Sequence, residues 1–136
     1  MIILKIYPIG NDRIFFRELL IKKYILMEDL KLRTIKNLAE KKGRVYVYLA
    51  NKEIGEKFMS IAEKEGFTFG DGVPLSEKRY ARVIAVNHNY TLNYINGIGL
   101  IAFGAGAKEI GDEELIRVDF EKYIAGDEDY NFNGKH

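Results

Sequence analysis

The sequence predicts a single α+β domain in which a mainly antiparallel sheet is flanked by an amphipathic helix and a long N-terminal helix. Its 136 residues, of which 47% are hydrophobic, suit one ordinary domain with one core. Residues 45–50 alternate as a strand does, and residues 54–62 then repeat apolar side chains at helical spacing. The strands expected later in the chain are joined by turns too short for a crossover, which favours antiparallel pairing.

The first 44 residues form a basic segment. They contain 11 lysines and arginines against 5 acidic residues, whereas residues 45–136 contain 10 and 15. Residues 2–7 predict a short buried strand. Residues 12–42 lack glycine and proline and carry apolar side chains at helical spacing, so they predict one long helix or two helices with a break near Glu28 and Asp29. We expect this long segment to pack on another chain, in a homo-oligomer.

Residues 45–126 are predicted to form the α+β core. Val45, Val47 and Leu49 should point to one face of their strand and the intervening tyrosines to the other. Asn51 is expected to cap the following helix, which Gly66 ends in the left-handed conformation. Later in the chain, residues 80–86 and 91–95 predict two strands of an antiparallel hairpin with its tip at residues 87–90.

The last part of the chain is less regular. Residues 98–107 are rich in glycine and apolar side chains, and their pattern does not distinguish a strand from a helix. Residues 115–118 predict another strand, after which Asp119 is expected to cap a short helix that Gly126 ends. Residues 127–136 are mostly polar or acidic, and we expect them to form a loose tail.

Several classes of function are disfavoured by composition. The chain has no cysteine, which excludes disulfides, thiolate zinc sites and cysteine nucleophiles. Its two histidines and its serines show neither metal-ligand spacing nor a catalytic triad, so we expect no catalytic residue, no metal and no cofactor. With no apolar run of about 20 residues and no signal peptide pattern, we expect a cytoplasmic protein without a membrane partner.

The predicted hairpin is the best candidate for a ligand site. Arginine can hold phosphate through two hydrogen bonds, asparagine offers donors and acceptors, and tyrosine offers a flat face for stacking. This combination suits a nucleotide, although an ordinary solvent-facing sheet surface remains the alternative. Strand alternation also prevents all of the side chains from converging. The candidate ligand-binding residues are Arg79, Arg82, His88, Asn89, Tyr90, Tyr94 and Arg117.

Three sequence runs carry a resemblance: EKFMSIAEKEGFTFGDGVPLSEKRY, RVIAVNHNYTLNYINGIG and IRVDFEKYIAGDEDY. Over roughly residues 45–130 the chain resembles small proteins carried by phages and mobile elements of low-GC Gram-positive, clostridial-type bacteria. Small phage proteins of this kind often counter host defence, and the anti-Thoeris sponges sequester a nucleotide signal in an oligomer without destroying it. The resemblance implies an anti-defence role in the bacterial cytoplasm and assigns no pocket residue.

Three functions follow as hypotheses. The leading one is a non-enzymatic, homo-oligomeric protein that sequesters a small anionic, cyclic nucleotide-like immune signal without cleaving it. This hypothesis is based on the lack of a recognisable catalytic motif, on the basic first part and acidic second part of the chain, and on the polar hairpin. Extended nucleic acid is not expected as a partner, because the larger part of the chain is acidic. The second is direct inhibition of a host defence effector, in the manner of anti-CRISPR proteins. The third is an enzyme acting on a phosphorylated small molecule, with His88 as general acid or base.

Overall fold

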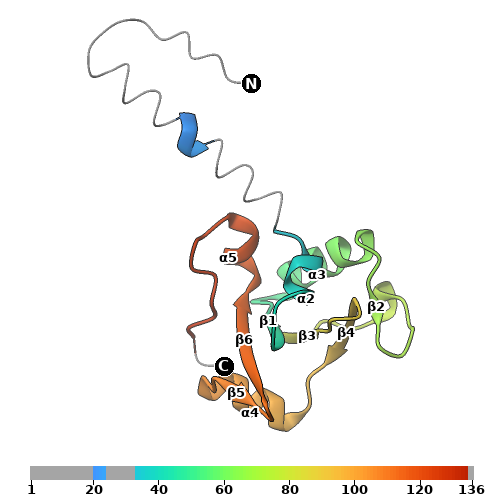
Figure 1. Ribbon diagram of the computed structural model, residues 1–136. Coiled ribbons are helices and arrows are strands. Elements are labelled where there is room, and N and C mark those ends of the chain that lie inside the picture. Colours follow the sequence, from blue (N-terminus) through green and yellow to red (C-terminus); the bar gives the residue numbers. More distant parts are fainter. Residues whose placement is uncertain (1–19, 24–32, 135–136) are drawn as a thin grey trace, which may run out of the picture. The chain divides into compact units, whose positions relative to one another are not determined.

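The computed structural model describes residues 20–23 and 33–134. Contacts divide the chain into residues 1–32 and residues 33–136, and each unit is described by itself. In the first unit, residues 20–23 are helical (Figure 1). The predicted strand at residues 2–7, the possible break near residues 28 and 29 and the oligomer contact expected of the long helix fall outside the described residues. The second unit begins at residue 33.

The basic segment contains a helix start at Thr34. Helix α2 (Ile35–Ala39) begins there because Thr34 is extended, with φ −100° and ψ 164°, and its side chain accepts a hydrogen bond from Asn37 N at 3.1 Å. The Glu65 carboxylate also accepts from the first two backbone N–H groups of α2, at 3.1 and 2.9 Å. Residues 12–42 are therefore not one continuous helix. The interruption lies where a threonine hydroxyl can satisfy the backbone of a new first turn.

Six strands form one mixed sheet in the order β2-β4-β3-β1-β6-β5 (Figure 1). The α+β class is confirmed, and the sheet is partly parallel: β1 pairs with β6 and β2 with β4 in parallel, whereas the pairs β1–β3, β3–β4 and β5–β6 are antiparallel. Turn length constrains only strands that follow one another, and β1 and β6 are separated by most of the unit. The strands are β1 (Arg44–Tyr48), β2 (Thr68–Phe69), β3 (Val83–Val86), β4 (Thr91–Tyr94), β5 (Glu109–Ile110) and β6 (Glu113–Asp119).

One face of the sheet is covered by α2, α3 (Lys52–Lys64) and α5 (Phe120–Ala125). The predicted inward residues of β1 lie in this core, fully or almost fully buried. Phe58 of α3 meets Phe120 of α5 edge to face, with ring centroids 4.9 Å apart. The amphipathic helix predicted after β1 is therefore confirmed, and its buried aromatic ring packs against α5.

The predicted ends of α3 are also confirmed. The Asn51 side chain accepts a hydrogen bond from Ile54 N at 2.9 Å, and Gly66 has φ +91° while the N–H of Phe67 donates to Ala62 O at 2.9 Å.

Replacing Asn51 by alanine should lower the free energy of unfolding by about 1 kcal/mol, because an N–H in the first turn of α3 loses its side-chain acceptor. Urea denaturation monitored by circular dichroism measures this change. Asn51→Asp is the matched control and should retain most of the stability, since aspartate also caps helices. Equal loss in both variants would contradict the assigned cap.

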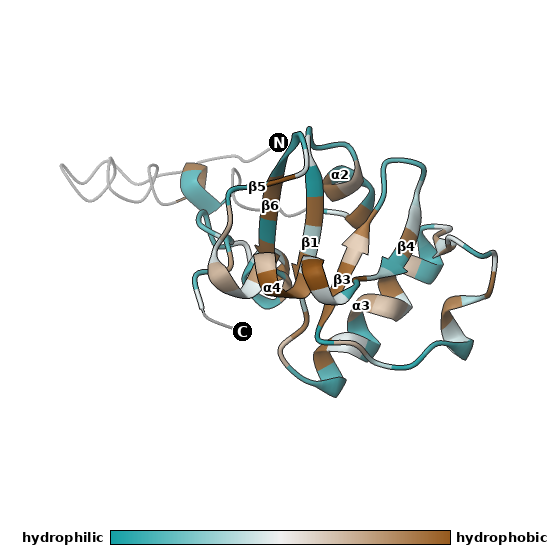
Figure 2. Ribbon diagram, turned by 90° about the horizontal axis from the view of Figure 1, so that it is seen from below, coloured by the Kyte–Doolittle hydropathy of each residue, from teal (hydrophilic) through white to brown (hydrophobic). Residues whose placement is uncertain are grey.

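The opposite face of the sheet carries α4 (Gly97–Ala105). Most of residues 98–107, whose pattern did not distinguish a strand from a helix, therefore belong to a helix. Asn96 caps it by accepting from Gly99 N at 2.8 Å, and Gly106 ends it with φ +76°. Apolar residues occupy all sides of α4 (Figure 2), and its outer side leaves Ile98 and Ile101 77% and 73% exposed. The ambiguity arose because a helix without a polar face has little periodicity.

The segment after α5 is not the loose tail that composition predicted. Asn131 bridges Val118 of β6, and the N–H of Phe132 donates to Arg117 O at 2.9 Å. The Phe132 ring is only 6% exposed and stacks on Phe103 of α4, with ring centroids 4.9 Å apart. A buried aromatic ring and hydrogen bonds to the β6 backbone therefore anchor this segment, up to residue 134 where the described residues end. The short helix α5 before it begins and ends as predicted.

Candidate functional site

The seven predicted ligand residues do not converge on one site. His88, Asn89 and Tyr94 line a polar pocket, Arg79 lines a separate groove and Arg117 lines a third, smaller cavity. Arg82 and Tyr90 line none of these three hollows. The hairpin thus supplies part of one site, whereas Arg79 and Arg82 lie before the start of β3 and Arg117 lies on β6.

The polar pocket, called here the asparagine pocket, lies on the face of the sheet that carries Tyr46, beside the start of α4. Its volume is about 740 Å³, within the range of small-molecule sites. Strands β1, β3 and β4, the hairpin tip and the cap of α4 contribute to its wall. Its lining is mostly polar, and the polar side chains are Arg44, Tyr46, Asn87, His88, Asn89, Thr91, Asn93, Tyr94, Asn96 and Glu113.

Hydrogen bonds between side chains order the hairpin end of this pocket. The Asn87 amide donates to Thr91 Oγ1 at 3.0 Å and to Asn93 Oδ1 at 2.5 Å. The Thr91 hydroxyl in turn donates to Asn89 Oδ1 at 2.6 Å. These bonds use Asn87 Nδ2 and Asn93 Oδ1, so within this network the side-chain oxygen of Asn87 and the side-chain nitrogen of Asn93 make no hydrogen bond. The network therefore presents an acceptor and a donor in fixed positions, as recognition of a polar ring requires.

Arg44 supplies the one permanent cation among the residues that line the asparagine pocket. Its Nε lies 3.3 Å from Glu113 Oε1, and the two side chains are 51% and 47% exposed. A side-chain hydrogen bond with Tyr46, followed by the bond with Glu113, raises the pKa of Arg44 above its ordinary value. An exposed ion pair of this kind contributes little to stability, so the guanidinium can exchange Glu113 for a phosphate oxygen.

Two polar contacts hold the hairpin tip against α2 and its C-cap residue Glu40. His88 Nδ1 lies 2.6 Å from Ala39 O, and the Tyr90 hydroxyl donates to Glu40 Oε2 at 2.7 Å. Tyr90 is the non-glycine residue with positive φ (+63°) in the described chain, and its ring also meets Phe67 edge to face. A left-handed tyrosine is strained, and these contacts hold it in place. Tyr90 therefore positions the loop that carries His88 and Asn89.

The Tyr90–Glu40 contact predicts a pH dependence. The hydrogen bond to Glu40, and then its negative charge, raise the pKa of the Tyr90 phenol above the ordinary tyrosine value. The neutral phenol makes this contact, so the contact persists through neutral pH and is lost as pH rises through the raised pKa.

An NMR titration of the tyrosine ring carbons tests this expectation. Glu40→Gln should lower the pKa of Tyr90 towards the ordinary value, whereas Glu121→Gln, at an exposed position of α5, should leave the pKa of Tyr90 unchanged. An unchanged Tyr90 titration in Glu40→Gln would contradict the contact.

Tyr94 borders the asparagine pocket, but its ring is engaged elsewhere. Its hydroxyl donates to Arg79 O at 2.8 Å, and its ring lies 5.0 Å from the Phe69 ring, centroid to centroid. Part of the Tyr94 ring surface that was expected to stack on a ligand thus packs against Phe69. Asn89 is closer to the predicted role, since its amide nitrogen remains on the exposed tip while its oxygen accepts from Thr91.

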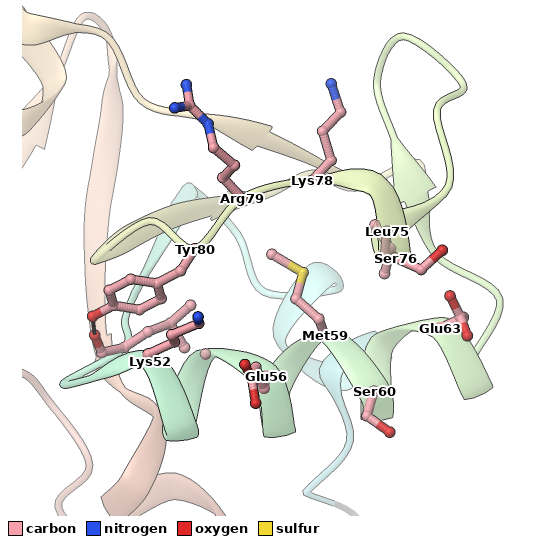
Figure 3. Close-up of a pocket in the computed structure, with 12 residues that line it drawn as sticks. Lys52, Glu56, Met59, Ser60, Glu63, Leu75, Ser76, Lys78, Arg79 and Tyr80 are labelled. Carbon is pink, nitrogen blue, oxygen red and sulfur yellow. Dashed lines mark hydrogen bonds between the residues drawn. The ribbon is translucent and has the colours of Figure 1, made fainter.

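The three predicted arginines lie apart from the asparagine pocket. Arg79 points away from the groove that its backbone lines (Figure 3), and Arg82 is exposed where its carbonyl accepts from Leu49 N at 2.7 Å. The Arg117 guanidinium donates to Phe103 O at 3.0 Å and lies over the Phe103 and Phe132 rings. Arg117 therefore ties α4 and the C-terminal segment to β6.

Arg44, Asn87 and Asn93 line the pocket but are not among the residues predicted from sequence. A usable signal was present, because strand alternation places Arg44 on the same face as Tyr46. The missing information was which strand lies beside the hairpin. The pairing of Val45 with Val86 puts the start of β1 next to the hairpin tip.

Comparison with known proteins finds no family model, no curated protein and no solved structure that matches the chain. In residues 20–23 and 33–134, histidines and carboxylates do not form a group of three that could hold a metal ion. The helices in the same residues are too short or too polar to cross a bilayer.

Proposed function

We propose that the asparagine pocket captures a small anionic, nucleotide-like ligand and holds it without cleaving it. One observation carries this proposal: a guanidinium and an ordered amide network line the same pocket of about 740 Å³. The Arg44 guanidinium suits a phosphate group, for which arginine has the matching fork of donors. The free atoms of Asn87 and Asn93 suit the edge of a base, which offers complementary acceptors and donors.

Glu113 sets the charge preference of the pocket. Glu113 is paired with Arg44. When a phosphate binds to Arg44, a phosphate oxygen takes the place of the Glu113 carboxylate oxygen beside the guanidinium. Because the pair is half exposed, its separation costs little. A ligand with a single phosphate at this point is thereby favoured over an extended polyanion, since Glu113 and the acidic residues around β5 repel further negative charge.

The biological role that we propose is that of a phage-type, anti-defence accessory protein of the bacterial cytoplasm, which removes an immune signal from solution. The resemblance of the three quoted runs to small phage proteins supports this role. We also propose that the protein acts as a homo-oligomer through its basic N-terminal segment. The excess of cations before residue 45 and of acidic residues after it supports head-to-tail contact between copies.

Native mass spectrometry of the purified protein, with and without a panel of linear and cyclic nucleotides, tests the proposal. The expected result is an oligomer that gains the mass of one intact nucleotide per site and releases it unchanged on heating. A released nucleotide with altered mass would replace the proposal by the enzymatic alternative. A protein that gains no nucleotide mass but pulls down a host effector would replace it by direct inhibition.

A further inference from the structure

A second hollow lies on the helical side of the sheet, between α3 and residues 75–80 (Figure 3). We call it the Tyr80 groove. It includes the short 3-10 helix η1 (Leu75–Glu77) and has a volume of about 740 Å³. Its floor is apolar, because Leu49 and Leu75 are buried there and Met59 is partly buried. A concave apolar floor of this size is typical of small-molecule sites.

The aromatic wall of the groove is fixed in position. The Tyr80 hydroxyl donates to Leu49 O, and the Tyr80 ring lies directly on the backbone of α3 at Gly55, where a Cβ atom would overlap the ring. Tyr80 as a whole is nevertheless 38% exposed. Met59 points into the same space (Figure 3), so an aromatic ring and a flexible thioether face the groove together. Both surfaces favour a flat, polarizable guest.

The charges of the groove are separated along its length. Lys52 lies beside the Tyr80 ring at one end, whereas Glu63 points towards Ser76 at the other (Figure 3). Glu56 borders the groove on α3 between them. The two cations of the opposite wall point away, and one of them, Lys78, is paired with Asp71 at 2.9 Å. The Tyr80 end is therefore the end that complements an anion.

From these features we infer a second ligand site, in which the Tyr80 groove binds a planar aromatic molecule that carries an acidic group. The ring lies between Tyr80 and Met59, where it displaces water from apolar surface, and this contact supplies most of the affinity. The acidic group lies at Lys52 and determines orientation, because an exposed lysine contributes modestly to binding. This site is independent of the asparagine pocket, which lies on the other face of the sheet.

Two fluorescent probes test the inference: 1-anilinonaphthalene-8-sulfonate, an aromatic sulfonate, and N-phenyl-1-naphthylamine, its neutral counterpart. We expect the sulfonate to bind saturably, with one probe per chain. Lys52→Glu, on an exposed residue, should weaken sulfonate binding several-fold and leave the neutral probe unaffected. Met59→Asp should weaken both probes at least tenfold, and Met59→Leu should retain both.

The exposed isoleucines of α4 provide the control for an unrelated apolar surface. The double variant Ile98→Ser and Ile101→Ser should bind both probes as the natural chain does. Loss of binding in this variant, or unchanged sulfonate binding in both Lys52→Glu and Met59→Asp, would overturn the inference. Urea denaturation of each variant shows that it is folded. Nucleotide capture is measured in the same samples, so failure of this site and failure of the asparagine pocket are seen separately.

Discussion

Replacing Arg44 by alanine is expected to weaken nucleotide capture about 10- to 100-fold. This range corresponds to the loss of one charge-assisted contact, because the pocket lining offers no second permanent cation to replace the guanidinium. Isothermal titration calorimetry with the nucleotide that the native protein retains measures the change. Arg44 is half exposed, so its removal should leave the fold intact.

Two matched variants sharpen this test. Arg82→Ala removes an exposed arginine that does not line the asparagine pocket, and it should leave affinity unchanged. Glu113→Gln removes the carboxylate that competes for Arg44, and it should increase affinity. The assignment fails if Arg82→Ala weakens capture as much as Arg44→Ala does.

Replacing Phe58 by alanine is expected to lower the free energy of unfolding by about 3–5 kcal/mol. The side chain is fully buried and packs edge to face on Phe120, so its removal leaves a cavity between α3 and α5. Guanidinium denaturation measures the loss. Ile101→Ala is the control: it truncates an apolar side chain that is 73% exposed on α4, and it should change stability by less than about 0.5 kcal/mol. A small effect of Phe58→Ala would contradict the described core.

The local features of the fold were predictable from sequence. The caps Asn51 and Asp119 and the terminating glycines Gly66 and Gly126 act within a few residues, so their pattern is complete in the chain itself. The parallel pairing of β1 with β6 was not predictable in this way. It depends on which distant strand fills the open edge of β1, and only the packed core decides that.

The same distinction applies to the candidate site. The hairpin and its polar tip follow from local sequence, and His88 and Asn89 were placed correctly at that tip. Arg44 joins them only because β1 lies antiparallel to β3, a long-range pairing. Composition also misled for the C-terminal segment, where a single buried ring, Phe132, outweighs many polar neighbours. A few apolar contacts can order a segment that its average hydropathy describes as loose.

Side-chain amide NMR shows whether a nucleotide occupies the asparagine pocket. The ¹⁵N–H₂ signals of Asn87, Asn89 and Asn93 can each be assigned by substitution and followed as the nucleotide is added. We predict that the Asn87 and Asn93 signals and the Arg44 Nε signal shift together and saturate at one ligand per site. If bound nucleotide leaves these three signals in place, or shifts the signals of the Tyr80 groove instead, the nucleotide does not occupy the asparagine pocket.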